Sequence, residues 1–274
     1  ESGSGKSTLL HIIYGLLDLP EGQVIWRNKL LGGPKQTLIP GHEFMKLVAQ
    51  EFDIMPYISV AENIGSYLTK QDMEADEVRI NELLEVVDLV DYKHVFVKNL
   101  SGGQKQRVAA KALANAPEIL LLDEPFSHID FLRKSHLRRK LFTYLKENNI
   151  ACIYATHDSD EALAFSDKIL LLSATGTQEL FDTPEKVYQS VSTAYQASFF
   201  GEANDVSAWI KSDKAWYYAH ELKIAPKGPI QAKLTNSYFK GAYYLLELES
   251  SGKLIYVNPD LPIVKGERIH IDLR

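Results

Sequence analysis

Cysteine is almost absent from the sequence, which has one such residue, Cys152, among 274. A single cysteine excludes an intramolecular disulfide and fits a protein that works in a reducing compartment. Cys152 lies inside the apolar run 150–155. We therefore expect its side chain to pack in the interior of the protein.

Long apolar runs and an excess of basic residues are also missing. No stretch approaches the roughly 18 apolar residues that span a bilayer, and the polar, Gly- and Ser-rich start is unlike a signal peptide. The net charge is -6 and the pI is about 5.8, so the clustered Lys and Arg that nucleic-acid phosphates require are lacking. We therefore expect no membrane-spanning segment and no nucleic-acid partner.

The composition is that of a folded protein, with 45% hydrophobic and 24% charged residues. At about 150 residues per domain, the length favours two domains. We predict an α/β domain over residues 1–204 and a small β domain over residues 205–274. Residues 205–274 hold 10 Lys and Arg against 8 Asp and Glu, so the acidity belongs to the first domain.

The sequence begins inside a phosphate-binding motif. Residues 1–8 read ESGSGKST and match G-x-x-x-x-G-K-[ST], except that the first Gly falls one place before Glu1. We therefore expect a segment upstream of Glu1 that contains a buried strand. The alternative is a flexible Gly- and Ser-rich terminus, which the helical pattern after Lys6 disfavours.

Each part of this motif has a chemical reason. Gly3 and Gly5 let successive backbone N–H groups point at phosphate oxygens, and the following helix adds its positive end. Lys6 supplies a positive charge for the β- and γ-phosphates, and Ser7 offers its hydroxyl to Mg²⁺.

Apolar residues at helical spacing predict further helices. The helix after the phosphate loop is expected to be buried through Leu9, Ile12, Ile13 and Leu16. Residues 58–117 are predicted to be mostly helical, with Ser59 as the cap of one helix and with an apolar face on another formed by Ile80, Leu83, Leu84 and Val87. A further helix is predicted to begin at Thr183 and Pro184 and to fade by Gly201.

Short continuous apolar runs that begin at Ile119, Ile150 and Lys168 predict strands buried on both faces of a parallel sheet. Residues 23–26 predict another strand, and the Gly-, Pro- and Lys-rich segment 28–41 predicts a loop. A helix between the first two runs is expected to turn its basic residues to solvent: Arg133, Lys134, Arg138, Arg139 and Lys140.

Beyond about Asp205 the apolar residues alternate with polar ones, as Ile230, Ala232 and Leu234 do, and as Ile269, Ile271 and Leu273 do. This period of two predicts strands, and the Gly and Pro turns between them suit a five-stranded barrel or sandwich. The aromatic cluster Trp216–Tyr218 is more often a core element than a nucleic-acid surface.

Two carboxylates follow the apolar run that begins at Ile119, where open α/β sheets collect their ligands. We expect Asp123 and Glu124 to point to opposite sides. One can then reach the metal that Ser7 binds, while the other approaches the attacking water as a general base.

The segment LSGGQ, residues 100–104, contains a second anion site. Ser101 and Gln104 have the spacing of a capping box, so Ser101 would begin a helix with free N–H groups at Gly102, Gly103 and Gln104. Two glycines at a helix start are best explained by the close approach of a phosphate. If both sites cannot reach one nucleotide in a monomer, two copies arranged head to tail would combine them.

His157 follows the run 150–156, so we expect its imidazole near the same γ-phosphate. Asp158 and Glu161 have the spacing of a helix cap. The histidines without comparable context are expected to be structural: His11, His42, His128, His220 and His270.

Taken in order, ESGSGKST, Gln50 in LVAQEF, LSGGQ, ILLLDEP, SHID and ATHD resemble the ATP-binding cassette (ABC) ATPases. The match covers residues 1 to about 200. FFGEAND followed by a β domain resembles the ATPase subunits of bacterial importers that carry a C-terminal TOBE-type domain. The implied fold class is α/β, a P-loop NTPase with an inserted helical subdomain, followed by a small all-β domain of the OB or TOBE type.

The resemblance also implies roles for individual residues. Phosphates would be wrapped by Ser2, Gly3, Ser4, Gly5, Lys6, Ser7 and Thr8. Gln50 would sense Mg²⁺ and the γ-phosphate, Asp123 would support the metal, Glu124 would be the base and His157 the γ-phosphate switch. ATP bound to the partner copy would be contacted by Ser101, Gly102, Gly103 and Gln104. Asp130 would sit in the loop that communicates across the dimer.

Two departures from the family pattern are visible. The aromatic residue on which the family stacks adenine precedes the phosphate loop, so it falls before Glu1 together with the first Gly. His128 and Ile129 stand where the family often has Ala or Asn and Leu, whereas Asp130 is in place. Neither His128 nor Ile129 takes the place of a catalytic group.

The resemblance implies an ATPase that uses ATP and Mg²⁺ and drives a bacterial importer. It would form a homodimer, pass its motion to transmembrane permease subunits, depend indirectly on an extracytoplasmic solute-binding protein, and lie on the cytoplasmic face of the inner membrane. Gln50 and the helical stretch after Pro56 would receive the permeases. The alternatives are a soluble cassette ATPase that works on ribosomes or DNA, and an inert fragment that binds ATP poorly.

Overall fold

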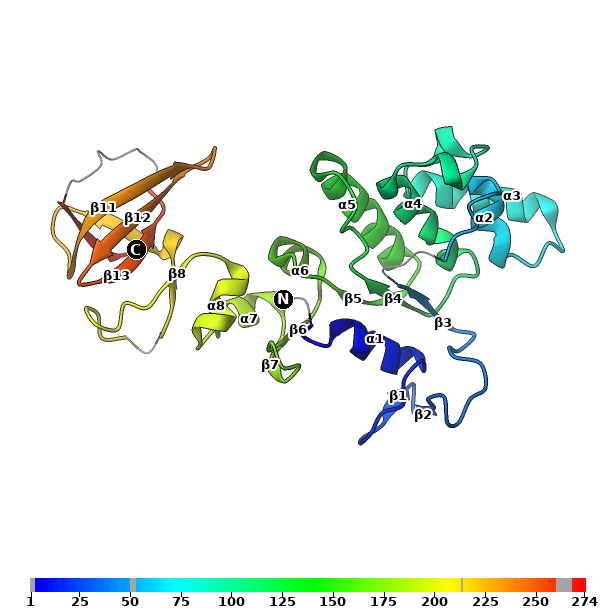
Figure 1. Ribbon diagram of the computed structural model, residues 1–274, viewed down its shortest axis with the longest axis horizontal. Coiled ribbons are helices and arrows are strands. Elements are labelled where there is room, and N and C mark those ends of the chain that lie inside the picture. The colour runs from blue at the N-terminus through cyan, green and yellow to red at the C-terminus, as the bar shows by residue number, and fades with distance from the viewer. Residues whose placement is uncertain (1–2, 50–52, 213, 260–267) are drawn as a thin grey trace. The chain divides into compact units, whose positions relative to one another are not determined.

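A computed structural model describes residues 3–49, 53–212, 214–259 and 268–274 (Figure 1). The chain divides into two compact units, Glu1–His157 and Asp158–Arg274. The predicted domain boundary after residue 204 stays a prediction. Among the described residues, no helix has both the length and the apolarity needed to cross a bilayer.

The first unit combines helices with short strands. Its helices are α1 (Lys6–Tyr14), α2 (Val60–Ile64), α3 (Met73–Val86), α4 (Gly102–Val108) and α5 (Phe131–Glu147), and its strands are β1 (Val24–Trp26), β2 (Lys29–Leu31), β3 (Met45–Val48), β4 (Ile119–Asp123) and β5 (Ala151–Ala155). Short 3-10 helices cover residues 65–67, 90–92, 97–99 and 109–113.

The strands β3, β4 and β5 form a parallel sheet with β4 in the centre (Figure 1). Every residue of β4 is buried, as predicted. In β5, Ala151 and Ile153 are exposed, so the expected burial on both faces is wrong for this strand. Among the described strands β5 pairs only with β4, which makes it an edge of the sheet.

Helix α1 lies beside this sheet (Figure 1). Its Leu10 is buried in one core with Ile119, Leu121 and Ala155. The predicted apolar face is confirmed only at Ile13, which packs against this core, whereas Leu9 and Ile12 are half-buried and do not belong to it. Leu16 is exposed. The cause is Gly15, whose left-handed φ of 86° ends the helix one residue before Leu16.

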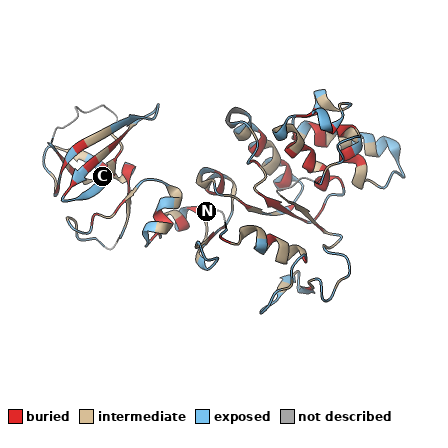
Figure 2. Cartoon of the chain, in the orientation of Figure 1, coloured by how far each residue is buried: buried red, intermediate tan, exposed pale blue. Residues whose placement is uncertain are grey.

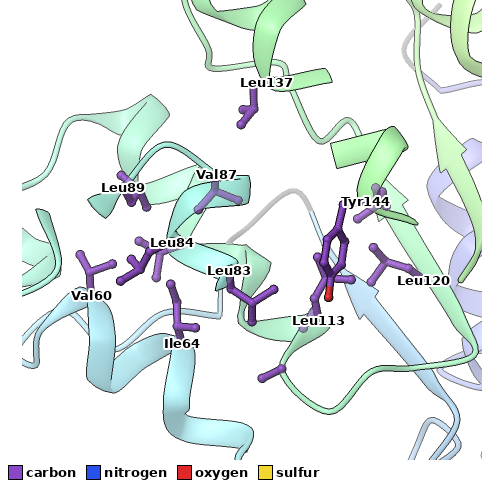
Figure 3. Packing of buried hydrophobic residues seen from close by; sticks show 14 of the residues in the cluster. Val60, Ile64, Leu83, Leu84, Val87, Leu89, Leu113, Leu120, Leu137 and Tyr144 are labelled. Atoms are coloured by element: carbon purple, nitrogen blue, oxygen red, sulfur yellow. The ribbon is translucent and has the colours of Figure 1, made fainter. Parts of the chain in front are cut away.

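Residues 58–117 are mostly helical, as predicted, and enclose a shared core (Figure 3). Ser59 caps α2 in a capping box with Glu62. Leu83 and Leu84 of α3 are fully buried, whereas Ile80 is only partly buried. This core continues to Leu120 and Leu122 of β4, which ties the helical segment to the central strand.

Helix α5 contributes Leu137, Tyr144 and Leu145 to the same core. Its basic residues do not all face solvent, because Arg138 is only 7% exposed. The Arg138 guanidinium carbon lies 5.6 Å from the centre of the Phe126 ring, a cation–π contact. The predicted solvated face is therefore wrong at this position.

The segment predicted as a loop after Trp26 contains a strand. Residues Arg27 and Asn28 have φ values of 46° and 63°, and they join β1 to β2 in an antiparallel hairpin. Two successive left-handed residues match the right-handed twist of paired strands. The Gly and Pro content that predicted a loop belongs to the residues after Leu31.

The second unit begins with helices and ends in an antiparallel sheet. Its helices are α6 (Ser159–Phe165), α7 (Pro184–Gln189) and α8 (Ala194–Phe200), and its strands are β6 (Ile169–Leu172), β7 (Gln178–Asp182), β8 (Ala203–Asn204), β9 (Tyr217–Tyr218), β10 (Leu222–Ala225), β11 (Ile230–Phe239), β12 (Tyr244–Ser250), β13 (Lys253–Val257) and β14 (Arg268–Leu273).

Strand β6 corresponds to the third apolar run, but it pairs with β7 in an antiparallel hairpin. The expectation that this run joins a parallel sheet is therefore wrong. Residues 173–177 connect β6 to β7, and this link is shorter than the roughly dozen residues of a parallel crossover, so these two strands pair as a hairpin.

The last five strands form one antiparallel sheet in the order β10-β14-β11-β12-β13. As predicted, buried and exposed residues alternate over residues 230–234 of β11, where Ile230, Ala232 and Leu234 face the core. Figure 2 shows both buried and exposed stretches in the strands of this sheet. Ile269 and Ile271 of β14 are buried in the same core. The assignment of this sheet to the TOBE type stays a prediction.

Helices α7 and α8 share an aromatic cluster with the start of this sheet region. The Tyr188 ring of α7 stacks on the Tyr218 ring of β9 with their centres 4.4 Å apart, and His220 stacks on Tyr218 at 5.9 Å. Tyr218 also packs against Val191 and Ala197. The predicted packing role of the aromatic cluster is thus confirmed for Tyr218.

Cys152 of β5 packs against the large core of the first unit. Burial raises the pKa of its thiol to about 12. Since the thiolate is the reactive form, the side chain is held in an unreactive state at neutral pH. This agrees with the packing role predicted from the sequence.

Candidate active site

The phosphate loop leads directly into α1. Gly3 and Gly5 have φ values of 95° and 80°, a left-handed conformation that suits glycine. Among the described residues, no atom lies within 4 Å of the place that a Cβ would occupy at either glycine. The backbone of this loop is therefore open to a ligand. Ser2 lies outside the described residues.

The start of α1 fits a phosphate group. Its first hydrogen bond runs from Leu9 N to Gly5 O at 2.8 Å, so the N–H groups of Ser7 and Thr8 have no partner within the helix. The Lys6 ammonium donates to Ser4 Oγ at 2.9 Å, which keeps its charge beside the loop. N–H groups, a helix start and a cation together suit an anion such as a triphosphate.

The two predicted carboxylates lie at the end of β4. Asp123 is the last residue of the strand and is 5% exposed. Glu124 follows with a φ of 48°, so the extended backbone ends at Asp123. Strand alternation therefore does not determine where the Glu124 side chain points. The argument that Asp123 and Glu124 point to opposite sides does not apply to this backbone.

Glu124 and His157, each expected near the γ-phosphate, are close together. The Glu124 amide donates to Ala155 O, at the end of the neighbouring strand β5, at 3.0 Å. His157 follows Ala155 by two residues, so this hydrogen bond brings Glu124 close to it. His157 Nδ1 lies 3.2 Å from Glu124 Oε1. The Glu124 side chain is 24% exposed and that of His157 is 59% exposed, so water can reach both groups. This pair can orient a water molecule and accept its proton.

The start of α4 is the second predicted anion site. Ser101 Oγ accepts from Gln104 N at 3.3 Å, and Gln104 Oε1 accepts from Ser101 N at 2.8 Å, which confirms the capping box. The Gln104 N–H therefore already has a partner, and the prediction that it is free for a ligand is wrong. The N–H groups of Gly102 and Gly103 have no partner within the helix.

The two glycines of α4 have different surroundings. Among the described residues nothing lies within 4 Å of a Cβ placed at Gly102, whereas a Cβ at Gly103 would lie 2.8 Å from His128 O. Gly103 therefore allows α4 to approach the loop before Asp130. Gly102 instead faces open space, which leaves room for a ligand.

The remaining predicted residues are placed as follows. Asp130 is the N-cap residue of α5, and Asp158 Oδ1 accepts from Glu161 N at 3.1 Å, which confirms the predicted cap. Gln50 lies outside the described residues, two positions after β3 ends at Val48. Among the histidines expected to be structural, His42 stacks on Phe44 with ring centres 5.3 Å apart.

Oxygen donors for a metal are present at two elements. Asp123 supplies a carboxylate at the end of β4, and Ser7 supplies a hydroxyl in the first turn of α1. The described residues contain no group of three or more His, Cys, Asp or Glu side chains that could hold a metal by themselves. One hydroxyl and one carboxylate fit Mg²⁺, which is held by few protein oxygens together with phosphate and water.

Two buried polar side chains, one of them in contact with the Glu124 segment, were not singled out from the sequence. Gln106 of α4 is 6% exposed, and its amide contacts the segment 124–128. Lys111 Nζ donates to Asp53 Oδ2 at 3.1 Å and lies 5.1 Å from the centre of the Tyr67 ring. Burial and the Asp53 charge raise the pKa of Tyr67. The sequence signal that could have identified Gln106 and Lys111 is a polar residue among apolar neighbours on a predicted helix.

Comparison with known sequences identifies relatives of the whole chain. The family model described as ABC transporter matches residues 1–127. The spermidine/putrescine import ATP-binding protein PotA of Clostridium novyi (strain NT) is 36% identical over 300 aligned residues, which cover 99% of this chain and 85% of that protein. The Fe(3+) ions import ATP-binding protein FbpC of Escherichia coli O157:H7 is 33% identical over 242 residues, which cover 85% and 67% respectively.

Solved structures agree with these relatives. The ATP-binding cassette MJ0796, determined as a dimer in a post-hydrolysis state bound to ADP and Pi, has a TM-score of 0.59 and 31% identity and covers 67% of this chain and 82% of that chain. The cbiO1 protein of Clostridium perfringens, part of the ABC transporter complex cbiONQ, has a TM-score of 0.59 and 28% identity, with coverages of 69% and 77%. The predicted P-loop ABC ATPase fold is thereby confirmed. The chain belongs to the ABC transporter family, in which it is an ATP-binding and ATP-hydrolysing subunit of the importer type.

Proposed function

We propose that two copies of the chain enclose ATP head to tail and that this closure drives solute import. The phosphate loop of one copy, from Ser2 to Thr8, would hold the triphosphate, and the start of α4 in the other copy would cover it. The observation that carries the proposal is the open space at Gly102, beside N–H groups that have no partner within α4. Such a helix start attracts an anion.

Within one closed site the chain's own residues divide the work. Lys6 and the α1 N–H groups bind the phosphates, and the Glu124 carboxylate accepts a proton from the attacking water. His157 holds that carboxylate through the 3.2 Å contact and contacts the γ-phosphate. When bound, Mg²⁺ neutralises charge on the phosphates, and Ser7, Asp123 and Gln50 would hold it. Asp130 would pass the state of one site to the other.

A patch of exposed apolar residues supports the docking of membrane subunits. Met55, Tyr57 and Phe96 are 40%, 76% and 48% exposed; Met55 and Tyr57 directly precede the helical segment 58–117, and Phe96 lies within it. The Lys98 ammonium lies 5.3 Å from the Tyr57 ring centre and 5.8 Å from that of Phe96, so Tyr57 and Phe96 belong to one surface. We propose that permease subunits dock here, with the chain on the cytoplasmic face of the membrane.

The partners decide between an importer and a ribosome- or DNA-associated ATPase. We expect the full-length protein, purified by affinity from gently solubilised membranes, to bring down integral membrane subunits. Recovery of ribosomes or DNA in place of membrane subunits would contradict the importer.

We propose that the cargo is a polyamine rather than ferric iron, because a relative that aligns with 99% of this chain is named for spermidine and putrescine. A solute-binding protein would deliver that cargo from outside.

Replacing His157 with Ala should lower the steady-state rate of ATP hydrolysis by about 10-fold or more, because Glu124 loses the side chain that orients it. ATP affinity, measured by equilibrium titration, should change little. The matched control is His136→Ala, since His136 is also exposed at 57% but lies on α5 beside Asp88. Equal rates of ATP hydrolysis for His157→Ala and His136→Ala would contradict a role for His157 in hydrolysis.

A further inference from the structure

We propose that Gln106 is a positioning residue that holds Glu124 in place and links it, within one chain, to the start of α4. This inference rests on the proposed function, because it takes Glu124 as the base and Gly102 as the contact to the partner's nucleotide. Gln106 is 6% exposed and lies on α4, one turn after Gly102. Its amide uses both of its ends, as the following contacts show.

The nitrogen end of the amide holds the base. Gln106 Nε2 donates to Glu124 O at 3.1 Å and to Ser127 Oγ at 3.4 Å. The same Glu124 carbonyl accepts from Ser127 N at 3.2 Å. Glu124 has a φ of 48°, a conformation that residues with a side chain adopt only when their surroundings impose it. The Gln106 amide is one of the groups that impose it.

The oxygen end of the amide holds the next turn. Gln106 Oε1 accepts from His128 N at 3.0 Å. Two residues along the loop from His128, Asp130 begins α5. Gly103 packs against the other side of the same residue, because a Cβ there would lie 2.8 Å from His128 O. Helix α4 therefore contacts His128 twice: Gln106 accepts from the His128 N–H, and Gly103 packs against the His128 carbonyl.

These contacts form a short mechanical connection. The N–H groups of Gly102 and Gly103 lie at one end of α4 and would bind the partner's nucleotide. Gln106, on the same short helix, contacts the backbone of Glu124 and His128. A nucleotide that draws the start of α4 toward it thus also sets the backbone of this chain's own base. Occupation of one site would in this way promote hydrolysis at the other.

The test uses steady-state ATP hydrolysis by the full-length protein. Gln106→Met keeps the side-chain length and removes both hydrogen-bonding ends, so we expect kcat to fall by about 10-fold while the ATP affinity stays within about 3-fold. Gln106→Glu keeps the acceptor for His128 N and loses the donor to Glu124 O, so it should also lower kcat. If both variants keep the original kcat, the inference is wrong.

The control is a buried glutamine of the same kind in the second unit. Gln196 is 4% exposed, accepts from Ser192 N at 2.8 Å and donates to Glu179 Oε2 at 3.0 Å. Gln196→Met should leave kcat unchanged. A thermal unfolding midpoint for every variant separates a loss of folding from a loss of positioning. An equal fall of kcat in Gln196→Met would show that any buried glutamine has this effect, which contradicts the inference.

A double variant separates this inference from the proposed function. If Gln106 acts through Glu124, then Gln106→Met should cause no further loss in a protein that already carries Glu124→Gln. Losses that simply multiply would overturn the role of Gln106 and leave the base in place. Glu124→Gln with an unchanged hydrolysis rate would instead reject the proposed base, whatever Gln106 does. The two failures therefore give different results.

Discussion

Replacing Glu124 with Gln is expected to lower the rate of ATP hydrolysis by about 10²- to 10⁴-fold while ATP binding and dimerisation stay intact. The amide keeps the size of the carboxylate and its place after β4, but it cannot accept the proton of the attacking water. Its oxygen still faces His157, which lies 3.2 Å from Glu124 Oε1. The measurement is steady-state phosphate release, with equilibrium ATP titration and size-exclusion chromatography on the same samples.

The same strand offers a matched control. Glu118 directly precedes β4 at its opposite end, where it pairs with Arg27 at 3.1 Å on an exposed surface. Glu118→Gln changes the same charge at the end of the strand opposite to Glu124, so the rate of hydrolysis should not change. A Glu124→Gln protein that hydrolyses ATP at the original rate would remove Glu124 from its role as base.

Replacing Gly102 with Ala is expected to lower hydrolysis by about 10²-fold or more, since a methyl group would keep a phosphate from the N–H groups at the start of α4. Nothing in the described chain lies within 4 Å of the new Cβ. The free energy of unfolding should therefore be unchanged, or raised by up to about 1 kcal/mol by the better helix former. Hydrolysis and thermal unfolding of the same variant check both halves of the prediction.

The neighbouring glycine provides the contrast. At Gly103 a Cβ would lie 2.8 Å from a backbone oxygen, His128 O, so Gly103→Ala must displace the loop or the helix. That variant should lose thermal stability as well as activity, whereas Gly102→Ala should lose activity alone. Full activity of Gly102→Ala would mean that no ligand approaches this end of α4, and the proposed two-copy site would fail with it.

Features set by neighbours in the sequence could be predicted. The caps at Ser59, Ser101 and Asp158 depend on residues three positions apart, and all three form as predicted. The alternating burial along β11 depends only on its own residues and its single core-facing side. The pairing of Glu124 with His157 followed because two neighbouring parallel strands end at the same edge of the sheet.

Features set by distant segments could not be predicted. The apolar run 169–172 is equally suited to a parallel or an antiparallel partner, and the short connection to β7 decides for the second. The burial of Arg138 depends on its contact with Phe126, a residue outside α5. The left-handed backbone at Glu124 is held by contacts from Gln106 and Ala155, neither of which is its neighbour in sequence.

The aromatic stack of the second unit limits how the chain can be shortened. Tyr188 precedes residue 205 and Tyr218 follows it, yet their rings are only 4.4 Å apart. A cut at the predicted domain boundary would strip the cover from Tyr188 on one fragment and from Tyr218 on the other. Each fragment would then carry an exposed apolar surface that favours aggregation. Any autonomous version of the C-terminal sheet should therefore retain the helices from Pro184 onward.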